Sequence, residues 1–335
     1  MVLRLPHGRL LNYMLPIENI YALAADEMRE VNLVIRRRLS SEVALINELS
    51  NYIIAGGGKR LRPLVLLLAA RALGYTGIDH IKLAAVVEFI HTATLLHDDV
   101  VDGSELRRGR KTANYLWGNE ASVLVGDFLY SRSFQMMVEV QNQRVMEILA
   151  NATNVIAEGE VMQLLHCHDP ETCEESYLDV IRCKTAKLFE AAGALGAVLA
   201  GRPEHEVALG EYGLHLGIAF QLIDDVLDYR ASAAEMGKNV GDDLEEGKPT
   251  LPLIYALHHG TPAHAALIRN AILTGGRELL PEVLDAIATS GAIAYTKGVA
   301  RDEATKAQAA LANLPRGIYQ EALHGLVEFS LHRHS

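Results

Sequence analysis

The stretch LLHDDVVDGSELRRGR, residues 95–110, gathers three aspartates just before two adjacent arginines. Asp98 and Asp102 are four residues apart, so on a helix they share one face, and Asp99 lies close beside that line. Like charges at this spacing destabilise a helix unless something neutralises them. Carboxylates can be neutralised by a divalent cation, and an all-oxygen ligand set suits Mg²⁺ or Mn²⁺ rather than zinc.

A second copy of the acidic pattern follows later in the chain. QLIDDVLDY at 221–229 repeats it with Asp224, Asp225 and Asp228. A solvated acidic helix end is the alternative interpretation of one such motif, but apolar pairs interleave the acids in both copies. Mg²⁺ usually binds carboxylates together with substrate phosphate oxygens. Two facing clusters would therefore hold several ions around one diphosphate.

Two groups of basic residues lie beside glycines, one well before the first acidic cluster and one directly after it. GGGKRLRP at 56–63 carries Lys59, Arg60 and Arg62, and its proline suits the first turn of a helix. The free N–H groups of a helix start, with cations beside them, favour phosphate binding. Alone, this stretch also fits a flexible surface turn. Arg107 and Arg108 directly follow the first acidic cluster.

These side chains must be positioned by helices. Apolar residues recur at three- and four-residue spacing, which predicts helices over 18–54, 62–73, 79–102, 112–140, 144–166, 174–200 and 204–229, with shorter ones beyond 249. Period-two strand patterns are scarce. The chain is predicted to be all-α, one large helical bundle over 18–335, after a poorly ordered extension over 1–17. Each acidic cluster then lies at the end of a long helix.

Composition narrows the function. The 335 residues carry a net charge of −11, which disfavours nucleic-acid binding. Three cysteines do not make a disulfide framework and fit a reducing, cytoplasmic location. No apolar run reaches the roughly 18–20 residues that span a bilayer. Loose contact with a membrane surface stays open.

Seven motifs together resemble the trans-type polyprenyl diphosphate synthases, most closely their bacterial octaprenyl branch. They are GGGKRLRP, EFIHTATLLHDDVVDGSELRRG, ASVLVGDFLYSRSFQMM, GEVMQLL, KTAKLFEAA, FQLIDDVLDY and GKNVGDDLEEGKPTLPL. The resemblance runs from about residue 20 to 332. It implies helices around a central cavity, a homodimer, and three Mg²⁺ ions that bind an allylic diphosphate next to isopentenyl diphosphate.

The resemblance also implies roles for individual residues. It makes Asp98, Asp99, Asp102 and Asp224 metal ligands, and Asp225 and Asp228 complete the metal site, partly through water. The allylic diphosphate would be held by Arg107, Lys184, Lys238 and Lys248, with Thr185 and Gln221 beside them. Isopentenyl diphosphate would be held by Lys59, Arg62, His91 and Arg108. By position alone, the three lysines of the allylic set would be ordinary surface residues, and His91 could be a satisfied core histidine.

Product length depends on how deep the cavity is. Short-chain relatives typically carry an aromatic residue four or five positions before the first aspartate, where this chain has the small Thr94 and Ala93. We therefore expect a product beyond C20, near C40, with C35 and C45 open. Phe134 and Met137 are candidates for the floor of the cavity, although both also fit an ordinary core.

Three alternatives remain. HCHDPETC at 166–173 has the residue types of a zinc site but no standard zinc spacing. A terpene cyclase would need no basic isopentenyl diphosphate pocket, and its second motif usually differs. A non-catalytic subunit of a heteromeric synthase usually lacks part of the acidic or basic set, which is complete here.

Overall fold

The computed structural model describes residues 15–230 and 241–333, and in these ranges the predicted all-α bundle is confirmed. The α-helices are α1 (Ile17–Leu23), α2 (Ala25–Leu39), α3 (Ala44–Ala55), α4 (Leu61–Ala72), α5 (Asp79–Val101), α6 (Ala113–Trp117), α7 (Asn119–Val138), α8 (Gln143–His166), α9 (Glu174–Ile181), α10 (Lys187–Leu199), α11 (Glu206–Asp228), α13 (Asp242–Glu245), α14 (Leu251–His259), α15 (Pro262–Thr274), α16 (Leu280–Ser290), α17 (Ala292–Ala310) and α18 (Ile318–His332). The shorter elements are the π-helix η1 (Arg182–Ala186), the 3-10 turns η2 (Pro203–His205) and η3 (Arg277–Leu279), and strands β1 (Leu106–Arg107) and β2 (Arg110–Lys111).

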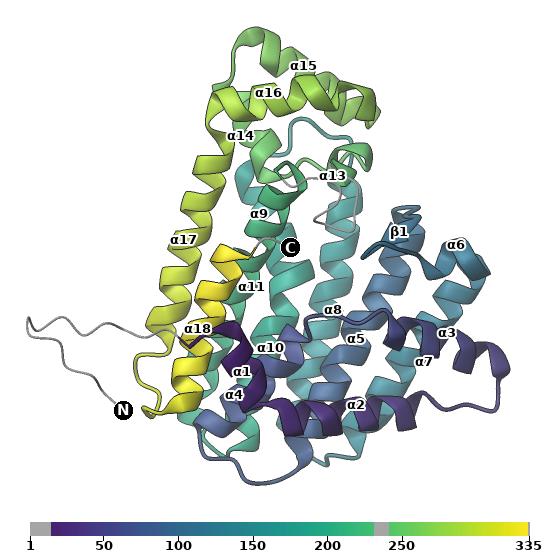
Figure 1. Cartoon of the computed structure of the whole chain (residues 1–335), viewed down its shortest axis with the longest axis vertical. Coiled ribbons are helices and arrows are strands. Elements are labelled where there is room, and N and C mark those ends of the chain that lie inside the picture. Colours follow the sequence, from purple (N-terminus) through teal and green to yellow (C-terminus); the bar gives the residue numbers. More distant parts are fainter. Residues whose placement is uncertain (1–14, 231–240, 334–335) are drawn as a thin grey trace, which may run out of the picture.

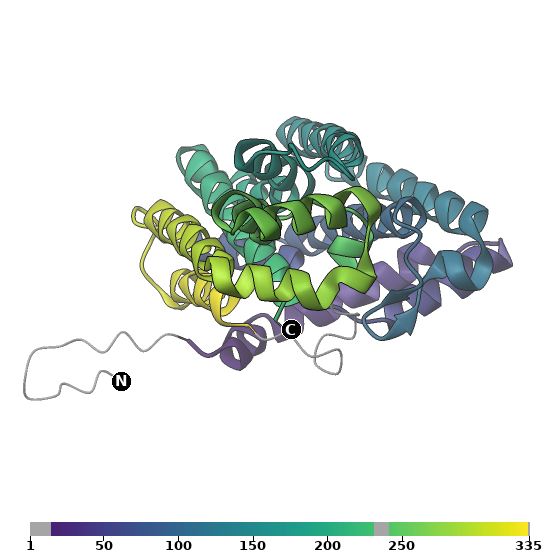
Figure 2. The ribbon, with the colours of Figure 1, turned by 90° about the horizontal axis from the view of Figure 1, so that it is seen from above.

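The long helices run side by side, and α15 and α16 lie across one end of the bundle (Figures 1 and 2). Helix α10 packs on α11 and α4, α11 packs on α17, and α5 packs on α7. The main hydrophobic core lies between these helices, and a separate cluster joins α14, α15 and α16. Helices α4 and α5 are apolar on several faces because they lie inside the bundle.

Glycines bring α10 and α11 close together. A Cβ at Gly193 of α10 would collide with the backbone of Leu209, and a Cβ at Gly213 of α11 would collide with the backbone of Phe189. No other residue type would allow the two helices this approach. The pair therefore has one fixed arrangement, and this arrangement sets the position of the second acidic cluster at the end of α11.

Several predicted helices are divided in the structure. The predicted 18–54 helix is three helices, because Ala24 leaves helical geometry and the chain is extended at Ser40. The predicted 112–140 helix is broken at Gly118, whose φ of 87° is readily adopted only by glycine. The predicted 174–200 helix contains the π-helix η1. The predicted helices over 79–102 and 144–166 match α5 and α8 to within a residue at each end.

Two predictions fall partly on residues that the structure does not describe. Lys238 lies in 231–240, outside the described residues, and so do residues 1–14 of the predicted extension. The division of the chain at residue 17 stays a prediction. Across the described residues, no helix combines the length and the apolar character that crossing a bilayer needs.

Candidate active site

A cavity of about 1020 Å³ opens where α5 and α11 end, and both acidic clusters lie on its wall. Residues far apart in sequence meet here. The predicted site residues on its wall are Lys59, Arg62, His91, Thr94, Asp98, Asp102, Arg107, Arg108, Lys184, Thr185, Gln221, Asp224, Asp225, Asp228 and Lys248. A polar cavity of this size, with convergent charged groups, is the best candidate for a substrate site.

In the first cluster, Asp98 and Asp102 face the cavity as the helical spacing predicts, and each carboxylate contacts a lysine from elsewhere in the chain. Lys184 Nζ lies 3.2 Å from Asp98 Oδ2, and Lys248 Nζ lies 2.7 Å from Asp102 Oδ2. The carboxylates raise the pKa of Lys248 against the effect of burial. These ammonium groups relieve the repulsion between the aspartates.

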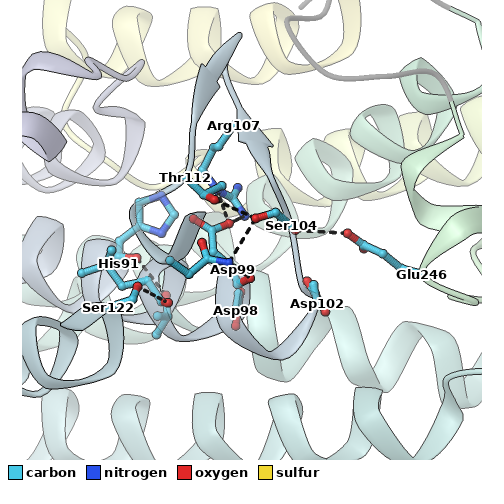
Figure 3. A network of polar contacts seen from close by, with 12 residues as sticks. His91, Asp98, Asp99, Asp102, Ser104, Arg107, Thr112, Ser122 and Glu246 are labelled. Carbon is cyan, nitrogen blue, oxygen red and sulfur yellow. Dashed lines mark hydrogen bonds and ion pairs between the residues drawn. The ribbon is translucent and has the colours of Figure 1, made fainter. Parts of the chain in front are cut away.

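Asp99 turns away from the large cavity. Its Oδ1 accepts hydrogen bonds from Arg107 Nε at 2.8 Å and Nη2 at 2.6 Å, beneath the β1–β2 hairpin (Figure 3). Burial raises the pKa of Asp99, whereas the Arg107 guanidinium lowers it. Asp99 instead borders a smaller cavity of about 100 Å³. It therefore holds the hairpin arginine in place, and its predicted role as a metal ligand stays a prediction.

Lys184 and Thr185 lie in the π-helix η1 between α9 and α10. π-Turns are rare and often mark functional sites. Lys184 Nζ also donates to Glu160 Oε2 at 2.5 Å and to Gln163 Oε1 at 2.6 Å, both on α8. Burial and the nearby Asp98 charge raise the pKa of Glu160 to about 7. The wider turn thus directs Lys184 toward α8 and the first acidic cluster.

The second cluster is held by neighbouring side chains as well. Arg333, just after α18, donates to Asp224 Oδ1 at 2.9 Å. Asp225 is buried and accepts hydrogen bonds from Gln221 Nε2, at 2.8 Å, and from the Tyr177 hydroxyl. Burial and the Asp243 charge raise the pKa of Asp225 to about 8, although the two hydrogen bonds lower it. Asp228 Oδ2 accepts a long hydrogen bond, 3.3 Å, from the backbone N–H of Asp243.

The donor chemistry of the two clusters fits a hard divalent cation, because every ligand that faces the cavity is a carboxylate oxygen. In the part of the chain that the structure describes, however, no three His, Cys, Asp or Glu side chains converge closely enough to hold a metal ion as they stand. Lys184, Lys248 and Arg333 engage the oxygens instead. A metal would bind by replacing these contacts.

The predicted isopentenyl diphosphate residues lie on the same cavity wall and are called the basic cluster below: Lys59, Arg62, His91 and Arg108. Arg62 is half-buried, its guanidinium lies 4.4 Å from the centre of the Phe189 ring, and its Nη1 lies 3.2 Å from His91 Nε2. Arginine only donates, so His91 Nε2 must accept and the ring is neutral. Burial and the charges of nearby arginines hold the pKa of His91 well below its usual range, which agrees with a neutral ring. Arg108, at a φ of 55°, donates to the Gly57 carbonyl oxygen.

Lys59 has a depressed pKa, about 8, because burial and the charges of Arg333 and Arg108 oppose its ionised form, whereas Asp224 favours it. The Tyr21 hydroxyl donates to the Lys59 carbonyl oxygen at 2.7 Å and so ties the basic turn to α1. The cluster therefore has excess positive charge that a diphosphate could neutralise.

The residues predicted to set product length are only partly on the cavity. Thr94 lies on its wall, and its hydroxyl donates to the His91 carbonyl oxygen at 2.8 Å. Ala93 and Met137 are buried in the main core, and Phe134 packs against that core. These three do not border the cavity, so their role stays a prediction.

The segment HCHDPETC at 166–173, which has the residue types of a zinc site, forms hydrogen bonds with distant parts of the chain. His168 N–H donates to the Gly247 carbonyl oxygen at 2.8 Å, and His168 Nδ1 lies 3.0 Å from the Ile272 carbonyl oxygen. The loop thus joins α8 to α15.

Reasoning from sequence missed several charged residues on the cavity wall. Among them are Glu88, Glu160, Glu246 and Arg333. GEVMQLL contained Glu160, and GDDLEEGK contained Glu246, whose carboxylate lies 2.6 Å from Lys248 Nζ and accepts from the Ser104 hydroxyl (Figure 3). Nothing near Arg333 in the sequence indicated a contact with α11.

An all-α bundle whose cavity combines two carboxylate clusters with an arginine- and lysine-rich wall defines the class of prenyltransferases that act on diphosphates. The family model described as polyprenyl synthetase matches residues 43–287. The chain belongs to the polyprenyl synthetase family.

Individual relatives agree with this. The chain is 55% identical to octaprenyl diphosphate synthase of Escherichia coli K12 over 95% of its length and 99% of that protein. It is 46% identical to an all-trans-nonaprenyl-diphosphate synthase of Rhodobacter capsulatus, over 94% and 98% of the two chains. A polyprenyl synthase of Caulobacter crescentus CB15, solved with calcium and isoprenyl diphosphate, superposes with a TM-score of 0.92 at 48% identity, over 95% and 98%.

Proposed function

We propose that this chain is a long-chain trans-prenyltransferase. It adds isopentenyl diphosphate to an allylic diphosphate, such as farnesyl diphosphate, in successive 1′-4 condensations. The observation that carries the proposal is the single cavity on which both acidic clusters and the basic cluster meet. We propose octaprenyl diphosphate (C40) for a quinone side chain as the product, with C35 and C45 as the nearest alternatives.

The first step breaks the C1–O bond of the allylic substrate, and both electrons leave with the diphosphate. Lys184, Lys248 and Arg107 lie around the first cluster and are positioned to hold that diphosphate. Their fixed charges stabilise the negative charge that develops on the leaving group. Thr185 Oγ1 donates to Gln221 Oε1 at 3.0 Å, which holds both side chains on the wall beside Lys184.

In the second step, C4 of isopentenyl diphosphate attacks the allylic carbon. Lys59, Arg62, Arg108 and neutral His91 bind the diphosphate of this substrate and orient its double bond. A proton then leaves C2, and the released diphosphate accepts it. Apolar side chains such as Leu95, Phe189 and Phe220 exclude water that would quench the cation.

We propose Mg²⁺ as the metal, three ions per site, with Mn²⁺ as a substitute. The metal would be held by Asp98, Asp102, Asp224 and Asp228, and Asp225 would support the site. Asp99 would join these ligands if Arg107 left it to bind the substrate diphosphate. When bound, Mg²⁺ supplies Lewis-acid stabilisation of the diphosphate leaving group. The all-oxygen donor set supports this choice.

We also propose a homodimer and a cytoplasmic location, with one catalytic domain over 18–335. Exposed apolar side chains on consecutive helices α7 and α8 support the dimer, among them Leu124, Val161, Leu164 and Leu165. Contact with a membrane surface would allow the long product to leave.

A product assay tests the function. Purified protein is incubated with farnesyl diphosphate, labelled isopentenyl diphosphate and Mg²⁺, and the dephosphorylated products are sized by chromatography. A single long product near C40 is expected. A C15–C20 product would keep the reaction and reject the product length. No Mg²⁺-dependent product from the chain alone would favour the non-catalytic subunit.

A further inference from the structure

A buried carboxylate lies beside the basic cluster. Glu88 belongs to α5, one turn before His91, and its side chain is 10% exposed. It forms an ion pair with Arg60 and borders both the large cavity and the smaller one. A buried carboxylate is costly unless cations surround it. The basic cluster therefore contains its own anion.

Three arginines act on Glu88. Burial raises the pKa of Glu88, and the charges of Arg60, Arg62 and Arg108 lower it. Glu88 in turn favours the charged forms of Arg62 and Arg108. These two arginines belong to the proposed isopentenyl diphosphate site, and their charges oppose each other. Glu88 offsets this repulsion when no substrate is bound.

Arg60 connects Glu88 to the backbone of the basic turn. It has a φ of 49°, a left-handed conformation that is uncommon outside glycine, and it immediately precedes α4. Lys59 lies just before it and Arg62 two residues after it. A fixed Arg60 side chain therefore fixes the turn from which both neighbours reach the cavity.

We propose that Glu88 is a positioning residue which, through Arg60, holds the Lys59–Arg62 turn in the geometry that binds the diphosphate of isopentenyl diphosphate. This inference rests on the proposed function. Glu88 does not itself contact substrate. The direction of the change in binding distinguishes this role from a purely electrostatic one. If electrostatics alone mattered, removing the negative charge of Glu88 would tighten the binding of an anionic substrate. If Glu88 positions the turn, removing it weakens that binding.

Glu88→Gln tests this inference, with Glu27→Gln as the matched control. Like Glu88, Glu27 is a carboxylate with little exposed surface, 17% of its side chain, that pairs with an arginine of α4, at 2.5 Å from Arg71 Nε. Arg71 lies at the opposite end of α4 from Arg60, and Glu27 borders neither cavity. In Glu88→Gln we expect the KM for isopentenyl diphosphate to rise about tenfold, with the KM for farnesyl diphosphate nearly unchanged. In Glu27→Gln we expect both KM values to stay as in the wild type, whatever happens to the melting temperature.

An unchanged or lower KM for isopentenyl diphosphate in Glu88→Gln would overturn the inference. A double-mutant cycle with Arg60→Met adds a second test, because a residue that acts through Arg60 gives effects that do not add. Additive effects would also overturn it. If Glu88→Gln does not fold, Arg60→Met alone must raise the same KM.

The proposed function can fail separately, if the wild type makes no product. Calorimetric binding of inorganic diphosphate then replaces the kinetics, and Glu88→Gln must bind it more weakly than Glu27→Gln does. Equal or tighter binding would reject the positioning role.

Discussion

At the scale of single residues, the aspartates that face the cavity are balanced by cations from distant parts of the chain. Asp98 contacts Lys184, and Asp224 contacts Arg333. We expect Asp98→Ala or Asp224→Ala to lower kcat by about a thousandfold, the scale of lost metal-assisted charge stabilisation. Initial rates at saturating substrate, with circular-dichroism melting to check folding, measure this.

Asp127→Ala is the control, because Asp127 is an exposed aspartate of α7 that does not border the cavity. Near-normal turnover in either cavity variant, or an equal loss in the control, would reject the metal assignment.

Lys59 makes the activity sensitive to alkaline pH. A lysine binds diphosphate only while it is protonated, and its pKa in the free enzyme is about 8. We therefore expect kcat/KM for isopentenyl diphosphate to fall as pH rises above about 8, since this parameter reports the free enzyme. Lys59→Arg should move the decline to higher pH. A pH profile that is the same in wild type and variant would show that another group titrates.

The types and spacing of residues predicted which side chains gather at the cavity, but not how they pair. Helical periodicity was enough to put Asp98 and Asp102 on one face. It could not show that Asp99 pairs with Arg107, or that Glu88 pairs with Arg60, because each pair depends on how a loop folds back onto α5. Arg333 was unpredictable because its contact with Asp224 depends on how α18 packs against α11.

At the scale of elements, the helices over 79–102 and 144–166 were predicted well, and the π-helix η1 was not. A π-turn leaves the apolar pattern of 174–200 almost unchanged, so the sequence cannot distinguish it from an α-helix. In the structure η1 packs closely against α8 at Gly159. This contact needs a glycine on α8, which is separated from η1 in the sequence by a loop and by α9.

Gly159→Ala tests that contact. The added Cβ would lie 2.7 Å from the Lys184 backbone nitrogen and 2.8 Å from Cys183 Cβ, closer than real contacts allow. We expect the free energy of unfolding to fall by about 1–3 kcal/mol, as for other overpacked sites. Turnover should fall too, because η1 must shift and carry Lys184 with it. Thermal melting and initial rates measure both effects.

Gly298→Ala is the matched control, because Gly298 lies inside α17 and its added Cβ would meet no atom within 4 Å. Alanine there should be neutral or stabilise the protein by up to about 1 kcal/mol. Equal melting temperatures for the two variants would contradict the close-packing argument.

At the scale of the whole molecule, α7 and α8 expose more large apolar side chains than a solvated surface needs, including Leu124 at 66% and Leu165 at 73%. For the proposed homodimer, we expect Leu124→Glu to produce a monomer, because it would bury an unpaired charge in the interface. Size-exclusion chromatography with light scattering measures this.

Ile318→Glu is the control, since Ile318 is an exposed apolar residue on α18, which packs on α4 and α17. A dimer that survives Leu124→Glu, or a monomeric wild type, would reject this surface as the interface.

The bundle and the place of its cavity were predictable, because two acidic helix ends and a basic turn had to meet for their charges to be balanced. The depth of the cavity was not. Ala93, Phe134 and Met137 are small or apolar residues like many others in the core. Whether such a residue borders a tunnel depends on the packing of several helices, which residue type alone does not encode.

Lysine side chains already contact the carboxylates that a metal would need, so the protein's own cations block its proposed metal site. Metal arriving alone would have to displace Lys184 and Lys248 from Asp98 and Asp102, and each ammonium group would then keep only its other carboxylate, Glu160 or Glu246, as an ion-pair partner. Metal arriving with a diphosphate gives them a new one. We therefore expect metal and substrate affinities to be reciprocally coupled, and in buffers poor in free metal the two lysines balance the charge of the aspartates.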